Sequence, residues 1–87
     1  MADPKLRVVI DEIQSQLAGA QGLPPDQRRS LEVLVRDLER LLDEPSAGEG
    51  TALRDRVTDA VRRLEASHPT LSTTLGNVVD TLAFFGL

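Results

Sequence analysis

The sequence predicts an all-α, bundle-like domain, and three observations carry that prediction. Apolar residues recur at spacings of three and four, the period of a helix that packs on one face. Proline and glycine fall between these stretches, where they end one helix and begin the next. No alternating apolar and polar run between turn residues indicates a strand. At 87 residues, the chain is expected to form one domain over residues 1–87.

An antiparallel helical hairpin is expected in the N-terminal half, over residues 4–18 and 25–43. Asp3 is suited to cap the first helix, since aspartate favours the N-cap and Pro4 then stands at the first helical position. The glycines that follow end this helix. Each helix carries one aliphatic stripe, made of Leu6, Ile10, Ile13 and Leu17 in the first and of Leu31, Leu34, Leu38 and Leu41 in the second.

The C-terminal half is expected to hold a helix pair over 51–85, after a flexible and exposed linker over 43–50. The linker reads DEPSAGEG, a composition typical of loops. Thr51 is a plausible N-cap for a third helix over 51–67, and a fourth helix follows over 69–85.

The junction Ser67-His68-Pro69 leaves two geometries open, a corner between two helices or one kinked helix. Proline inside a helix costs roughly 3 kcal/mol, and the residue before proline avoids helical backbone, which favours a corner capped by Ser67. An unbroken heptad seam instead favours one kinked helix. The seam consists of Val57, Val61, Leu64, His68, Leu71, Leu75, Val78, Leu82 and Phe85.

A resemblance to a known family rests on this same part of the chain. The stretch LEASHPTLSTTLGNVVDTLAFFGL holds a Glu-Ala-Ser-His-Pro-Thr-Leu box before a last helix. With QRRSLEVLVRDLERLL as the second helix, it resembles a family of small bacterial proteins catalogued only as a domain of unknown function. The resemblance implies an all-helical fold. It implies no particular activity, because none is assigned to the family.

Composition excludes several kinds of partner and site. The formal charge is −4 and arginines are interleaved with carboxylates, so no nucleic-acid partner is expected. No window is apolar enough to span a membrane, and no signal-peptide core is present, so we expect a cytoplasmic protein. The chain has no cysteine and one histidine, which makes a poor ligand set for zinc.

No catalytic set is recognisable, so we expect neither an enzyme nor a cofactor or metal site. His68 has no carboxylate at a spacing that would orient it as a base. It is expected to cover the helix junction, with a pH-sensitive contact or a metal ligand as alternatives. The hydroxyl cluster that follows is expected to form a solvated first turn, rather than a phosphorylation site; its members are Thr70, Ser72, Thr73 and Thr74.

The last helix carries more apolar residues than one stripe needs, which indicates an interface. Gly76 costs about 1 kcal/mol in mid-helix, a cost easier to explain if another helix packs closely there. The expected interface residues are Leu75, Val78, Val79, Leu82, Phe84, Phe85 and Leu87.

The leading hypothesis is therefore a non-enzymatic module that self-associates, with a dimer as the first expectation, and binds an unidentified protein. Short chains bury little surface and gain stability from association. The alternative is a small ligand- or metal-responsive regulator with His68 near the contact.

Overall fold

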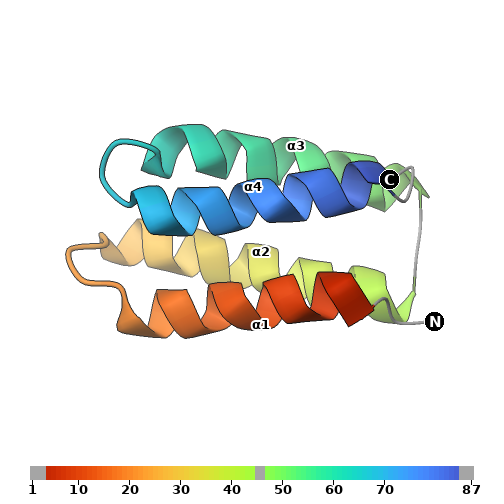
Figure 1. Cartoon of the computed structure of the whole chain (residues 1–87), viewed down its shortest axis with the longest axis horizontal. Helices are drawn as coiled ribbons and strands as arrows, with labels where there is room; N and C mark the ends of the chain where they lie inside the picture. The colour runs from red at the N-terminus through yellow and green to blue at the C-terminus, as the bar shows by residue number, and fades with distance from the viewer. Residues whose placement is uncertain (1–3, 45–46, 85–87) are drawn as a thin grey trace.

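The chain forms an up-down-up-down bundle of helices, as expected from the sequence (Figure 1). The computed structural model describes residues 4–44 and 47–84. The loops between the first and second helices and between the third and fourth lie at the same end of the bundle. The helices are α1 (Pro4–Gly19), α2 (Pro25–Asp43), α3 (Ala47–Leu64) and α4 (Pro69–Phe84).

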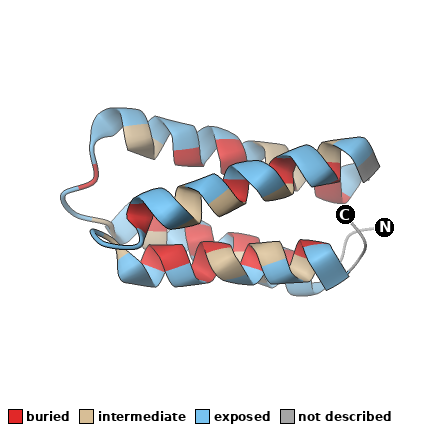
Figure 2. Cartoon of the chain, turned by 90° about the horizontal axis from the view of Figure 1, so that it is seen from above, coloured by how far each residue is buried: buried red, intermediate tan, exposed pale blue. Residues whose placement is uncertain are grey.

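The helices surround one aliphatic core. α1 packs against α2 and α4, and α3 packs against the same two helices. Buried residues line the inward faces of the helices (Figure 2). Leucine, isoleucine and valine make up the whole buried apolar cluster, which includes Ile13, Leu38, Val57, Leu75 and Val78. The stripes read from the sequence are therefore the core-facing sides of the helices.

Proline stands at the first position of α1, α2 and α4, where it costs no hydrogen bond. Pro25 and Pro69 stand at the first positions of α2 and α4, where a backbone N–H would have no helical partner. The carbonyl oxygens of the residues just before Pro25 and Pro69 accept the first hydrogen bonds of these helices. The Arg28 N–H donates to Pro24 O at 2.9 Å, and the Ser72 N–H donates to His68 O at 3.0 Å. His68, rather than Ser67 as expected, therefore occupies the N-cap position of α4.

The chain turns at the junction, so the corner is confirmed and the single kinked helix is wrong. α3 ends at Leu64, and α4 returns alongside it in the opposite direction (Figure 1). The His68 N–H donates to Leu64 O at 2.7 Å and closes the last turn. The heptad spacing runs through the corner because both helices face the same core.

The expected linker over 43–50 was too long, and the third helix boundaries were wrong. α3 spans Ala47–Leu64 instead of 51–67, so Thr51 lies within the helix and is not its N-cap. Gly50 is buried and lies three residues before Leu53, which continues the core-facing stripe of α3. Packing of this turn outweighs the poor helix propensity of glycine.

Candidate functional site

The residues expected to form an interface divide between the core and the surface. Leu75, Val78 and Leu82 are each 0% exposed in the core of the chain itself, so they were wrongly assigned to an interface. A lone helix would expose them, but α1 and α3 cover α4 on both sides. Val79 is half-buried against the core, and Phe84 is 77% exposed. Phe85 and Leu87 lie outside the described residues.

Phe84 is the most exposed large apolar side chain among the described residues. Lys5 Nζ of α1 lies 5.6 Å from the centre of its ring, within the range of a cation–π contact. This contact joins the start of α1 to the end of α4 and leaves most of the ring open to solvent. Phe84 is therefore the described part of the expected interface that remains accessible.

His68 joins the two helical hairpins at the loop end of the bundle. Its Nε2 lies 3.1 Å from the backbone oxygen of Gln21 in the α1–α2 loop. Because a carbonyl oxygen only accepts, Nε2 carries the hydrogen in this bond. Its Nδ1 lies 3.1 Å from Ser67 Oγ. Both ring nitrogens therefore have a protein partner, and one of the two partners lies in the other hairpin.

The hydroxyl cluster of α4 is partly a packing feature, so the expected solvated first turn is wrong for two of its members. Ser72 and Thr74 are 5% and 3% exposed. Ser72 Oγ donates to Val61 O of α3 at 2.9 Å. Thr74 Oγ1 lies 2.8 Å from Gln16 Oε1 of α1 and 3.1 Å from Thr70 O. These hydroxyls tie α4 to both neighbouring helices.

Arg28 of α2 caps the C-terminal end of α1. Its Nη1 donates to Leu17 O at 2.6 Å, and its Nη2 donates to Ala20 O at 2.9 Å. The last carbonyls of a helix have no partner within it, and the negative end of the helix dipole attracts a cation there. This arginine therefore stabilises the α1–α2 turn. The sequence alone gave Arg28 no individual role, because the carbonyls that it meets lie 11 and 8 residues earlier in the chain.

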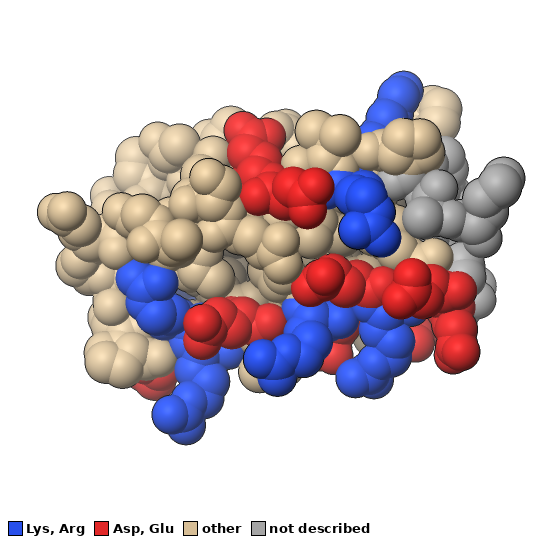
Figure 3. Space-filling view, turned by 90° about the horizontal axis from the view of Figure 1, so that it is seen from below, with Lys and Arg blue, Asp and Glu red and all other residues tan. Residues whose placement is uncertain are grey.

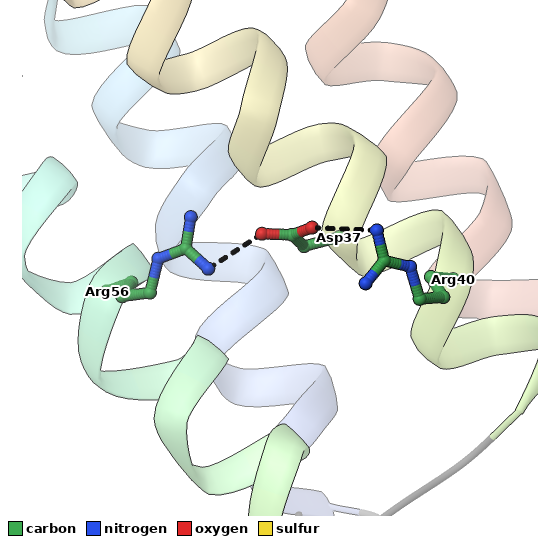
Figure 4. A network of polar contacts seen from close by, with 3 residues as sticks. All are labelled: Asp37, Arg40 and Arg56. Carbon is green, nitrogen blue, oxygen red and sulfur yellow. Dashed lines mark hydrogen bonds and ion pairs between the residues drawn. The ribbon is translucent and has the colours of Figure 1, made fainter.

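Asp37 links α2 to α3. Its Oδ2 lies 2.8 Å from Arg56 Nη1, and its Oδ1 lies 3.7 Å from Arg40 Nη2, so one carboxylate faces two guanidinium groups (Figure 4). The interaction with Arg56 crosses between helices, whereas Arg40 lies one turn along α2. This network pairs two of the arginines that the sequence interleaves with carboxylates.

Charges of both signs alternate along an edge of the face shown in Figure 3. The exposed side chains of α2 include Arg29, Glu32, Arg36, Arg40 and Asp43. Such mixing places opposite charges side by side, so each weakens the field of the other at this edge.

An open hollow lies between α2 and α3, on the loop-end half of these helices. We call it the α2–α3 groove; its volume is about 480 Å³. Its lining includes two small side chains, Ser30 and Ala60. Its apolar lining includes Leu31, Leu34 and Leu64, which are buried, and Val33, which is 40% exposed. Its charged lining comprises Asp26, Arg29, Arg56, Asp59 and Arg63.

Sequence reasoning missed the α2–α3 groove because it depends on which helix faces are adjacent. The only signal in the sequence was the pair of short side chains, Ser30 and Ala60, beside the leucine stripes. That signal has meaning only once α2 and α3 are known to be antiparallel neighbours.

Within residues 4–44 and 47–84, no group of three histidine or acidic side chains is arranged to hold a metal ion. The metal-responsive alternative around His68 stays a prediction. Across the same residues, no helix combines the length and the apolar composition needed to cross a bilayer.

Comparison with known proteins identifies the family of this chain. Neither the curated proteins nor the solved structures contain a match. A family model described as a domain of unknown function, DUF4404, matches residues 6–87, which is nearly the whole sequence and includes the box around His68. The chain therefore belongs to the DUF4404 family.

Proposed function

We propose that this domain is a non-enzymatic protein-interaction module that binds its partner through the α2–α3 groove. The observation that carries the proposal is the hollow itself, whose lining combines apolar and charged side chains. Elsewhere, the buried hydroxyls and Arg28 act inside the bundle, where they hold helices together. A surface that combines an apolar centre with arginine at its rim has the composition of a protein-binding site.

The test is affinity capture from an extract of the source cells, with quantitative mass spectrometry and two matched variants. Ala60→Leu fills the α2–α3 groove, whereas Val8→Ser changes an exposed apolar residue of α1. We expect a protein retained by the wild type and by Val8→Ser to be lost with Ala60→Leu. Circular dichroism spectra and melting curves confirm that each variant folds. Retention of the same proteins by all three chains would contradict this function.

Self-association through the end of α4 is a second candidate, supported by the exposure of Phe84. Sedimentation equilibrium at tens of micromolar tests it, with Phe84→Asp as the variant. We expect an oligomer that the substitution dissociates. A strict monomer for both chains would remove this candidate and leave the groove proposal intact. A cytoplasmic location, expected from the sequence, stays a prediction for cell fractionation.

A further inference from the structure

The outer sides of α1 and α4 lie next to each other and form one face, which is turned toward the viewer in Figure 1. We infer that this α1–α4 face binds a second copy of the chain across a two-fold axis close to Val8, with the two α1 helices antiparallel. The inference rests on self-association, the second candidate function, and assigns it a geometry. The face comprises Lys5, Val8 and Glu12 of α1 and Asn77, Thr81 and Phe84 of α4.

A buried contact fixes α4 against α1. Thr74 is 3% exposed, and its Oγ1 lies 2.8 Å from Gln16 Oε1. On α1, Gln16 lies one turn after Glu12, and its Nε2 donates to Glu12 Oε1 at 3.5 Å. Three residues continue this side of α4 at spacings of three and four; they are Asn77, Thr81 and Phe84. The two outer sides therefore form a surface that is already in place before a second copy binds.

The α4 part of the face carries no charge. Asp80 is the only charged residue of α4, and it lies outside the face, whereas α2 and α3 carry many charged residues on their exposed sides. Charged residues are depleted at the centres of protein interfaces. The composition of α4 therefore favours a surface that protein covers over one that only faces water.

Two exposed apolar side chains lie at one end of the α1–α4 face. Val8 is 64% exposed and Phe84 is 77% exposed; they are two of the three large apolar side chains that are exposed among the described residues. Lys5 connects them, since it lies one turn before Val8 on α1 and its Nζ lies 5.6 Å from the centre of the Phe84 ring. A second copy on this face would remove both apolar side chains from water, which favours binding.

The charges of α1 are complementary to those of the same helix in reverse. Lys5 lies three residues before Val8, and Glu12 lies four residues after it, at about 4.5 and 6 Å along the helix axis. When two such helices pack antiparallel with Val8 against Val8, each Lys5 lies opposite Glu12 of the second copy. A parallel pair would instead place Lys5 against Lys5 and Glu12 against Glu12.

Both charged groups can take part in this pairing. Among residues 4–44 and 47–84, Glu12 has no cation within ion-pair distance. An ammonium has three donors, so Lys5 can bind a carboxylate and keep its contact with Phe84. A partner on this face must offer a positive, an apolar and a negative position in the reverse order, and the chain offers them itself, as an interface with two-fold symmetry requires.

The experiment is sedimentation equilibrium of the full chain and of two charge-reversal variants, alone and mixed. The contact involves parts of two helices in each copy, so we expect a small interface and association on the order of tens of micromolar. Lys5→Glu and Glu12→Lys each place like charges opposite one another in a pair of identical chains. We expect each variant alone to associate at least about tenfold more weakly than wild type. An equimolar mixture of the two should recover wild-type association, because each mixed pair contains two opposite-charge contacts.

Further variants locate the contact. Val8→Asp should weaken association at least about tenfold. Arg7→Glu, which makes the same change of charge as Lys5→Glu at an exposed position of α1 outside the face, should leave association unchanged. Ala52→Asp, at an exposed position of α3, is the matched control for Val8→Asp. Circular dichroism spectra and melting curves confirm that each variant folds.

The outcomes separate this geometry from the functions proposed above. A wild type that stays monomeric would overturn both the geometry and self-association. Because Val8 lies outside the α2–α3 groove, the groove proposal would remain. Oligomers that both charge variants leave unchanged, or a mixture that fails to recover association, would overturn the antiparallel pairing while self-association stands. A monomeric wild type that captures a cellular protein, which is then lost with Val8→Asp, would overturn the inference in favour of a different partner on this face.

Discussion

The imidazole Nε2 of His68 lies 3.1 Å from the backbone oxygen of Gln21, which is 47 residues earlier in the chain. This bond connects the α3–α4 turn to the α1–α2 loop, so it joins the two hairpins where their loops meet (Figure 1). A histidine that sequence reasoning weighed as a site is therefore a link between the halves of the fold.

The tautomer of His68 is the first prediction. The neutral ring should carry its hydrogen on Nε2, because the Gln21 carbonyl only accepts, and Nδ1 should accept from the Ser67 hydroxyl. Long-range ¹H–¹⁵N correlation spectra of the side chain distinguish the two tautomers. A predominant Nδ1–H form would show that the bond to Gln21 is absent in solution, and His68→Ala provides the assignment control.

Arg28 should contribute more to stability than its neighbour Arg29. Arg28→Ala leaves the Leu17 and Ala20 carbonyls without their charged donor, so we expect the free energy of unfolding to fall by about 1.5–3 kcal/mol. Arg29→Ala removes an exposed side chain and should change it by less than about 0.5 kcal/mol. Urea unfolding measures both, and equal losses would contradict the capping role.

The hydroxyl of Thr74 should contribute more to the free energy of unfolding than the volume of its side chain does. Thr74→Val keeps the shape but removes the donor to Gln16 Oε1 and Thr70 O, so we expect a loss of about 1 kcal/mol in the free energy of unfolding. Thr74→Ser keeps the hydroxyl and loses only a methyl group. Thermal and urea unfolding should rank the valine variant below wild type, with faster amide exchange where α4 meets α1. A valine variant as stable as wild type would contradict this hydrogen bond.

Gly76→Ala should stabilise the protein. No heavy atom beyond the immediate backbone lies within 4 Å of a Cβ at this position, so no helix among residues 4–44 and 47–84 makes the close contact expected from the sequence. Alanine is better than glycine in a helix interior by about 1 kcal/mol, and the melting temperature should rise accordingly. Destabilisation would indicate that this face of α4 is covered in solution. The Val79→Ser variant on the same helix would then report the same surface.

Truncation should cost far more stability at a core position of the last helix than at a surface position. Leu82→Ala empties a fully buried position and should cost about 2–5 kcal/mol. Phe84→Ala removes a ring that is 77% exposed and should cost at most about 1 kcal/mol, the size of its contact with Lys5. Urea unfolding at one protein concentration compares them. A large, concentration-dependent loss for Phe84→Ala would show that this ring is covered by a second copy.

Local chemistry determined much of this fold. The aliphatic stripes at spacings of three and four and the prolines that begin helices are readable from the sequence, because each depends on residues within one or two turns. The same local rules left the junction at Pro69 open between a corner and a kinked helix, and the structure decided for the corner. The family resemblance was readable for the same reason, since its box lies in one continuous stretch.

Only the tertiary structure decided the features that depend on contacts between distant segments. The start of α3 moved to Ala47 because the turn around Gly50 packs into the core. The structure places Leu75 in the core and Ala60 in the lining of the α2–α3 groove. It also places the guanidinium of Arg28, a residue of α2, at the C-terminal end of α1. Helical periodicity shows which residues share a face, but the neighbour of that face follows from how all the helices bury their stripes together.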